Sequence, residues 1–180
     1  HDGQLIVQLP QSASLSFTPI KLKEDRSEQA TTKLGKEFET EDFFVVFNDN
    51  YEITTLFDKK RQRDVLPKGQ IMNQLIAYED LPMNYDAWDI DPYYDQKAYN
   101  VDQIKEAVIV ENGPIRDTIK LIRPFENSLI TQYIHFYHGT GRIDFETTVD
   151  WHLHHVLLKV QLPIAVNTLE ATFDIQFGNV

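Results

Sequence analysis

The sequence predicts a mostly β protein, folded as a large antiparallel sandwich. Aromatic residues are abundant, with 11 Phe, 8 Tyr and 2 Trp, whereas only 2 Met are present and uninterrupted helix-forming runs are scarce. This composition favours strands over helices. Long stretches of the second half alternate apolar and polar residues with a period of two, as a sheet with one buried face requires. The 180 residues, 42% of them hydrophobic, are enough to bury a substantial core.

The first part of the chain is predicted to contain two short strands and a linker. The strands are expected at residues 4–9 and 14–20, separated by Pro10 and a Ser-rich turn. The polar run 21–36 has no apolar period, which indicates a linker or a long surface loop. We therefore divide the chain into residues 1–36, from a preceding region, and a sandwich over residues 37–180. Because the chain begins with His1 and not Met, we expect it to be a piece of a longer protein.

A hairpin is predicted where the apolar pattern begins. Its strands are residues 43–47 and 51–57, and the turn is at 48–50. Asn50 is expected to adopt the left-handed conformation, because Asn tolerates a positive φ better than most residues other than Gly.

Five more strands are predicted in the second half. Along 141–151 the apolar residues are expected on one face and the acidic residues on the other. The first face comprises Ile143, Phe145, Thr147, Val149 and Trp151, and the second Asp144, Glu146, Thr148 and Asp150. Such half-apolar strands need a facing sheet, which predicts the sandwich. The predicted strands are 115–122, 128–137, 141–151, 156–162 and 171–177, with turns at 113–114, 126–127 and 139–141.

Residues 78–94 depart from the strand pattern and are crowded with acidic and aromatic side chains. Pro82 and Pro92 cannot donate to a strand ladder, so the segment is predicted to be a loop. Carboxylates beside aromatic faces are typical of sugar sites, where rings stack on C–H faces and carboxylates accept hydrogen bonds from hydroxyls. The alternative is a structural loop, with Trp88 in the core and aspartates that accept hydrogen bonds from local N–H groups.

The histidines near residue 152 could have one of two roles. On a strand, His152 and His154 would face the same side, a spacing that metal ligands can use. They could equally be polar residues on a solvated face, and neither they nor His155 are assigned a site. Carboxylate pairs such as Glu146 with Asp150 are also conceivable, but no pattern singles one out.

Charge and composition exclude several classes of partner. A formal charge of −11 would repel a phosphate backbone, so we expect no nucleic acid partner. A membrane-spanning helix needs an apolar run of about 18 residues, and the sequence has none. The pattern of a signal peptide, a charged segment followed by an apolar one, is also not present, so we expect no membrane partner. The absence of Cys removes disulfides and thiolate chemistry and is compatible with a cytoplasmic location, which we expect.

Several strings, taken together and in order, resemble the C-terminal region of family 38 glycoside hydrolases, the retaining, zinc-dependent α-mannosidases. Asn50 and Tyr51 depart from the family, which usually has a glycine in this turn. The matching strings are residues 41–44, 53–59, 73–94, 113–114, 123–125, 142–145, 149–152, 157–160 and 173–178.

The resemblance implies a fold and a division of labour. The fold would be an antiparallel supersandwich similar to that of galactose mutarotase. The parent protein would hydrolyse terminal α-mannosidic bonds of mannose-containing glycans. Zinc and the nucleophilic Asp would belong to an upstream catalytic domain of the same polypeptide, and no metal is expected in this chain. His1 and Asp2 do not continue as the family's zinc-binding string does.

For this chain the resemblance implies a scaffold that is inactive alone and has no catalytic residue, with a loop that borders the sugar pocket. Two other classes stay open: a free-standing carbohydrate-binding module, and a mutarotase-like epimerase that uses a His and Glu acid/base pair. The candidate substrate-binding residues are Tyr85, Asp86, Trp88, Asp89, Tyr93 and Tyr94.

Overall fold

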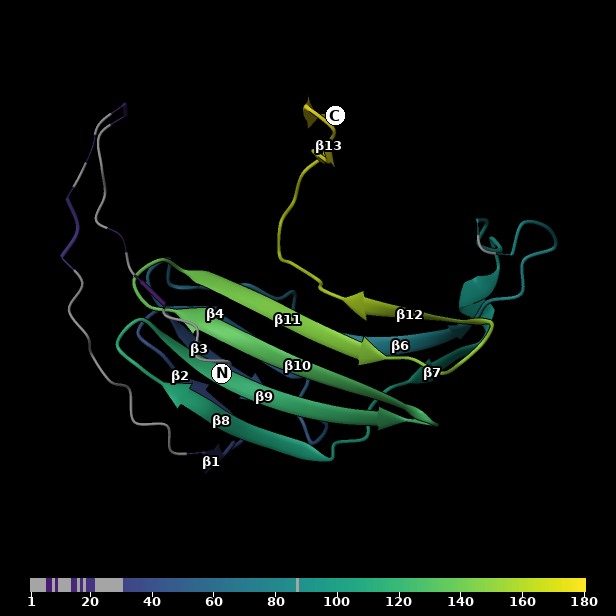
Figure 1. Ribbon diagram of the computed structural model, residues 1–180, viewed down its shortest axis with the longest axis horizontal. Coiled ribbons are helices and arrows are strands. Elements are labelled where there is room, and N and C mark those ends of the chain that lie inside the picture. The colour runs from purple at the N-terminus through teal and green to yellow at the C-terminus, as the bar shows by residue number, and fades with distance from the viewer. Residues whose placement is uncertain are drawn as a thin grey trace.

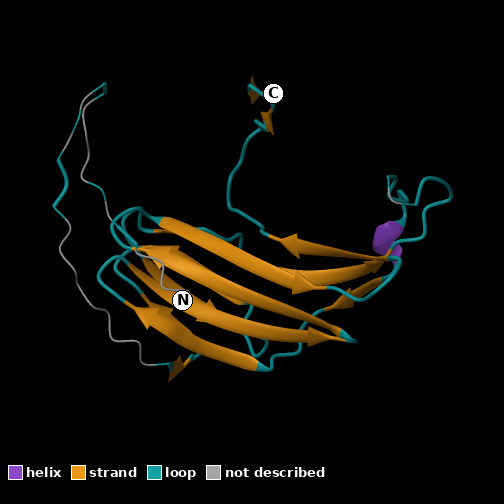
Figure 2. Cartoon of the chain, in the orientation of Figure 1, coloured by secondary structure: helices purple, strands orange, loops and turns teal. Residues whose placement is uncertain are grey.

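The computed structural model describes residues 6, 7, 9, 14, 15, 17, 19–21, 31–86 and 88–180. In this part of the chain the strands β1 to β14 are accompanied by a single short 3-10 helix, η1 (Figure 2). All strand pairs are antiparallel. The predicted mostly β fold is therefore confirmed. No helix in the described ranges is long and apolar enough to cross a membrane.

A long sheet forms the larger layer, with the strand order β1-β8-β9-β10-β11 (Figure 1). The β9–β10 hairpin turns at residues 126–127, as predicted, and Glu126 adopts a left-handed φ of 50° there. The strands are β1 (Thr32–Lys33), β8 (Glu106–Asn112), β9 (Arg116–Phe125), β10 (Ser128–Tyr137) and β11 (Arg142–Asp150).

The second sheet has the order β2-β3-β4-β5 and contains the predicted hairpin. Its turn differs in one respect, because Tyr51, with a φ of 53°, takes the left-handed conformation expected of Asn50. The side chain of Asn48 accepts hydrogen bonds from the backbone N–H of Asn50 (3.0 Å) and of Glu52 (2.9 Å), which shapes the turn around these residues. The strands are β2 (Glu37–Glu39), β3 (Phe43–Phe47), β4 (Ile53–Asp58) and β5 (Arg63–Asp64).

A third, smaller sheet has the order β12-β6-β7 and supports the predicted loop. Tyr78 and Glu79 lie in β6, so the prediction that the loop begins at Tyr78 is wrong. All but the ends of β6 is buried, so its sequence lacks the alternation that marks a strand with one solvated face. The elements are β6 (Gln74–Glu79), η1 (Tyr94–Gln96), β7 (Ala98–Asn100) and β12 (Val156–Gln161).

The C-terminal residues differ from the prediction. The strand expected at 171–177 is reduced to β13 (Asp174–Ile175), which among the described strands pairs with β14 (Gly178–Asn179) alone. The chain reverses at Phe177, which has a φ of 64°. After β12 the N–H of Ala165 still donates to the carbonyl oxygen of Val65 (2.7 Å), next to β5. Further on the chain leads away from the sheets, so the alternating apolar residues at 171–177 have no sheet to cover (Figure 1).

One face of the long sheet covers both smaller sheets and makes a sandwich, as predicted. At one end it packs against β2–β5, and at the other end against β6, β7 and β12 (Figure 1). The first cluster comprises Leu34, Phe38, Phe43, Val45, Phe47, Ile53, Leu56, Leu66, Met72, Ile119, Leu121, Ile134 and Phe136. The second comprises Leu75, Ala77, Val101 and Ile130, with Phe125, Trp151, Val156 and Leu158 packed against it.

The face predicted for β11 is confirmed for Ile143, Phe145 and Trp151, whereas Val149, which was predicted on the same face, is 40% exposed. Ile143 and Phe145 pack against the first cluster, and Trp151 packs against the second and stacks on Phe125 with ring centroids 6.0 Å apart.

A buried pair of amides joins the long sheet to the start of β6. Asn73 Nδ2 donates to Gln132 Oε1 (2.6 Å), and Gln132 Nε2 donates to Asn73 Oδ1 (3.1 Å). Gln132 Nε2 also reaches Thr147 Oγ1 (3.0 Å). The pair satisfies polar groups that would be costly to bury alone, and it fixes the strand from which the loop departs.

The structure tests only part of the predictions made for the N-terminal residues. The strands expected at 4–9 and 14–20 fall largely outside the described residues, and those described in these ranges are not in strands. The linker prediction for 21–36 is wrong at its end. Thr32 and Lys33 pair with Ile109 and Val108, and Leu34 is buried in the first cluster, because Leu34 supplies an apolar side chain within an otherwise polar run.

Candidate functional site: an acidic, aromatic loop

The loop between β6 and η1 projects from the end of the small sheet (Figures 1 and 2). Residues 80–93 form no strand or helix, so the loop predicted from Pro82 and Pro92 is confirmed for these residues, except for Ala87, which is not described.

The candidate aromatic residues are mostly exposed. Tyr85, Trp88 and Tyr93 are 76%, 88% and 69% exposed, and Tyr94 is half-buried. The alternative that Trp88 is in the core is therefore wrong for this chain, because the loop carries Trp88 away from both apolar clusters. Asp86 and Asp89 are also exposed, so rings and carboxylates are available together.

Hydrogen bonds within the loop shape its tip. Tyr85 has a left-handed φ of 56°, and its carbonyl oxygen accepts from the N–H of Trp88 (2.7 Å) and of Asp89 (2.9 Å). Asp91 Oδ1 accepts from the N–H of Tyr93 (2.7 Å). Asp91 therefore has the local role considered for the aspartates. The carboxylate of Asp86 instead faces His155 at 3.3 Å.

A shallow hollow of about 270 Å³ lies in the loop. Apolar walls and carboxylates meet there, an arrangement that could contact a small polar ligand with C–H faces. Of the predicted residues it brings together Asp89 and Tyr93, whereas Tyr85, Asp86, Trp88 and Tyr94 do not line it. It is lined by Pro82, Met83, Asn84, Asp89, Ile90, Asp91, Pro92 and Tyr93.

The histidines near residue 152 do not share a strand face. β11 ends at Asp150, so His152 and His154 follow it in irregular structure, and the spacing argument does not apply. His152 Nε2 lies 3.0 Å from Asp150 Oδ1, and His155 pairs with Asp86. Among the described residues, no group of three or more His, Cys, Asp or Glu is placed to hold a metal ion.

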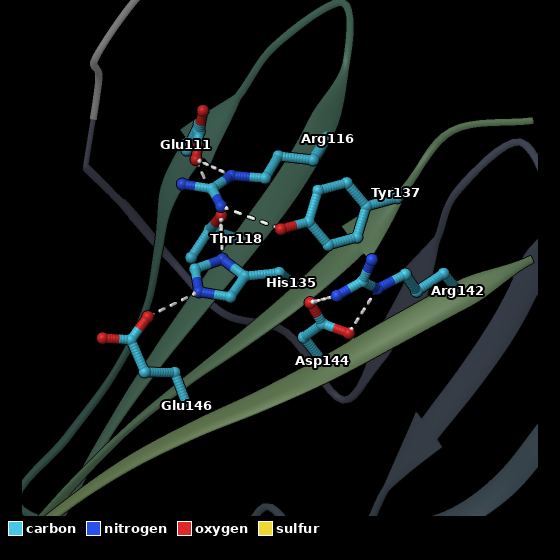
Figure 3. Close-up of polar contacts among 8 residues, drawn as sticks. All are labelled: Glu111, Arg116, Thr118, His135, Tyr137, Arg142, Asp144 and Glu146. Carbon is cyan, nitrogen blue, oxygen red and sulfur yellow. Dashed lines mark hydrogen bonds and ion pairs between the residues drawn. The ribbon is translucent and has the colours of Figure 1, made fainter. Parts of the chain in front are cut away.

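A second polar cluster lies on the outer face of the long sheet and was not predicted (Figure 3). Arg116 Nε donates to Glu111 Oε2 (2.8 Å), and its Nη1 donates to the hydroxyl of Tyr137 (3.3 Å). Arg142 makes two bonds of 2.8 Å to the carboxylate of Asp144, which lowers the pKa of that carboxyl. These groups are held by one another across β8, β9, β10 and β11.

His135 is at the centre of this cluster. Thr118 Oγ1 donates to Glu111 Oε2 (2.8 Å) and lies 2.9 Å from His135 Nδ1, while His135 Nε2 lies 3.3 Å from Glu146 Oε2 (Figure 3). A neutral imidazole has one ring proton, so it can donate to Thr118 or to Glu146 but not to both. A second ring proton would satisfy both partners, but burial and then the charge of Arg116 lower the pKa of His135.

The sequence indicated one part of this cluster, the shared face of the acidic residues on β11, but not the histidine that faces them. Alternation places Asp144 and Glu146 on one face of β11, as predicted. The register, which pairs His135 with Asp144 and Tyr133 with Glu146, is what brings the histidine to them. A single strand pattern does not specify the register with its neighbour.

Comparison with known proteins shows similarity to one family of enzymes. The family model described as "Glycosyl hydrolases family 38 C-terminal domain" matches residues 38–180. Alpha-mannosidase G of Dictyostelium discoideum is 30% identical over 142 residues, which are 76% of this chain and 13% of that protein. Alpha-mannosidase 2C1 of Homo sapiens is 29% identical over 130 residues, which are 71% of this chain and 12% of that protein.

A third relative, an alpha-mannosidase of Saccharomyces cerevisiae, is 24% identical over 114 residues, covering 59% of this chain and 10% of that protein. The chain thus spans only a small part of the length of the relatives that it matches. Because the family model covers most of the chain, the chain belongs to glycosyl hydrolase family 38 and represents its C-terminal domain.

Proposed function

We propose that the polypeptide containing this chain hydrolyses terminal α-mannosidic bonds, and that this chain is a non-catalytic sandwich that supports and borders the sugar pocket. The observation that carries the proposal is the loop, in which Tyr85, Trp88 and Tyr93 are exposed beside Asp86 and Asp89. A cluster of large, solvent-exposed aromatic rings on a projecting loop is more typical of an interaction site than of a purely structural domain.

The chemistry of these side chains suits a neutral sugar. The rings of Tyr85 and Trp88 can stack on the C–H face of a pyranose, and the carboxylates of Asp86 and Asp89 can accept hydrogen bonds from its hydroxyls. The half-buried Tyr94 would support the loop from the sheet side. These contacts bind and orient a sugar, and they break no bond.

The reaction itself would depend on groups outside this chain. The family resemblance implies a zinc ion in the upstream catalytic domain, where it would bind sugar hydroxyls. Among the described residues of this chain, no group of three or more His, Cys, Asp or Glu is placed to hold such an ion. The proposed partners are therefore mannose-containing glycans and that catalytic domain, and the proposed location is cytoplasmic, with which the absence of Cys is compatible.

The test is a Trp88→Ala substitution in the complete α-mannosidase, assayed with a chromogenic α-mannoside. Loss of one stacking ring should raise KM about two- to twelvefold with little change in kcat, since the contact is made equally in the ground and transition states. Tyr99→Ala is the matched control, because Tyr99 is an exposed aromatic on β7, outside the loop. If Trp88→Ala leaves both KM and thermal stability unchanged, the loop does not border the sugar pocket.

Mannose titration of the isolated chain, followed by NMR, separates this proposal from a free-standing binding module. We expect no saturable shift of the Trp88 signals, because the remaining walls of the pocket belong to the upstream domain. Saturable shifts at millimolar sugar would favour the binding module.

A further inference from the structure

The C-terminal end of the loop is fastened to β12. Lys159 Nζ donates to the hydroxyl of Tyr94 (2.5 Å) and lies 4.5 Å from the centroid of the Tyr94 ring. The same ring packs edge-on against Tyr78, with centroids 5.1 Å apart, and Tyr78 is buried in β6. Tyr94 is therefore held from two strands of the small sheet.

The N-terminal part of the loop is fastened to the turn just before β12. The N–H of Asp80 donates to the carbonyl oxygen of His155 (2.8 Å), and Asp86 Oδ1 lies 3.3 Å from His155 Nδ1. His155 has a left-handed φ of 55° at this turn. One short stretch, from His155 to Lys159, thus contacts both ends of a loop more than sixty positions earlier in the chain.

These contacts differ in kind from those inside the loop. The bonds from Trp88 and Asp89 to Tyr85, and from Tyr93 to Asp91, join loop residues to one another. They define the shape of the tip but not its orientation on the sheet. The orientation depends on the contacts with His155 and Lys159 and on the packing of Tyr94 on β6. Lys97 also bonds to Glu79 at the base of the loop, through its side chain (2.6 Å) and its carbonyl oxygen (3.1 Å).

We propose that Lys159 is a positioning residue, which holds the aromatic loop in the orientation in which it meets the sugar, with His155 as the second anchor. The effect on sugar binding rests on the proposed function, whereas the anchoring does not. The ammonium group of Lys159 is charged at neutral pH, and the hydrogen bond with Tyr94 raises its pKa further, so Lys159 keeps both its bond and its position over the ring.

The first test measures amide hydrogen exchange of the 180-residue chain. Lys159→Met keeps the aliphatic length and removes the charge, and Tyr94→Phe keeps the ring and removes the acceptor. Both should raise exchange of the amides in 80–96 about two- to fivefold without changing exchange in the long sheet. Lys159→Arg should restore most of the protection. The matched control is Lys120→Met, which makes the same substitution on the long sheet and removes the 2.8 Å ion pair with Glu106.

The second test measures kinetics of the same variants in the complete α-mannosidase. Lys159→Met should raise KM about two- to fivefold, leave kcat unchanged and be rescued by Lys159→Arg. Unchanged loop exchange in Lys159→Met would overturn the anchoring, whatever the kinetics.

Lys159→Met could loosen the loop, as seen by faster exchange, and yet leave KM unchanged. The KM of Trp88→Ala separates the two explanations of that result. If Trp88→Ala also leaves KM unchanged, the proposed function fails and the anchoring stands. If Trp88→Ala raises KM, the loop binds sugar but Lys159 does not position it, and the proposal is overturned.

Discussion

Replacing Gln132 with Met should destabilise the chain far more than the small change in volume suggests. Gln132 is 2% exposed and makes three side-chain hydrogen bonds, two with Asn73 and one with Thr147. Met keeps the bulk of Gln132 but leaves the side-chain N–H and C=O groups of Asn73, which is 1% exposed, without these hydrogen-bond partners. Each buried polar group left unsatisfied costs about 1–3 kcal/mol, and burial of the Met side chain offsets part of this. We expect a net loss of about 2–4 kcal/mol in the free energy of unfolding.

Urea unfolding of the isolated chain, followed by circular dichroism, measures this loss. The midpoint should fall while the slope m is unchanged, because the surface exposed on unfolding stays nearly the same. Gln74→Met is the matched control, since Gln74 is half-buried in β6 and has no side-chain hydrogen bond to the described residues. Its effect should be within about 0.5 kcal/mol. Equal midpoints for Gln132→Met and the wild type would refute the claim that this amide pair joins the two sheets.

Three further predictions concern the long sheet. Because burial lowers the pKa of His135, the stability that its neutral form contributes is present above the unfolded pKa of about 6.5 and is lost as the pH falls through the lower, folded value. The urea midpoint should therefore fall further on acidification for the wild type than for His135→Gln, and equal falls would contradict this. Glu146→Gln removes a carboxylate that raises the pKa of His135, so an NMR titration of the ring should show a still lower pKa, and an unchanged value would show that the 3.3 Å contact is not formed. Glu126→Gly should raise the free energy of unfolding by about 0.5–1 kcal/mol, because Gly adopts the left-handed φ of 50° without strain, and a loss of stability would contradict that explanation.

Strands with one solvated face were predictable from the sequence. β9, β10 and β11 alternate over nine or ten residues, and their predicted positions agree with the structure to within a few residues. β6 and β8 were missed for a physical reason. β6 is buried on both faces, and β8 carries the short apolar run 107–110 with a register irregularity between Ile109 and Glu111, so neither shows a clean period of two.

The opposite error occurred at the C-terminus. Residues 171–177 alternate well, yet only Asp174 and Ile175 form a strand, because a strand also needs a neighbour with which to pair. Alternation reports which side chains could share a face, and it does not report whether a facing sheet is present.

The sequence predicted that the candidate site is a loop, but not which of its side chains are exposed or which residues outside the loop contact it. The prolines and acidic residues at 80–93 indicated irregular backbone, and this was confirmed for the described residues 80–86 and 88–93. The exposure of Trp88 could not be derived, since a Trp among aspartates fits a core anchor or a binding ring equally well. The contacts with His155 and Lys159 could not be derived either, because they join segments far apart in the sequence through the pairing of β6 with β12.

Amide hydrogen exchange of the complete α-mannosidase, with and without saturating mannose, tests most directly whether the loop borders the sugar pocket. We expect mannose to slow exchange in residues 80–96 and to leave exchange in β8 unchanged. If mannose inhibits the enzyme competitively, and so occupies the active site, yet exchange in residues 80–96 does not change, the loop does not border the sugar pocket.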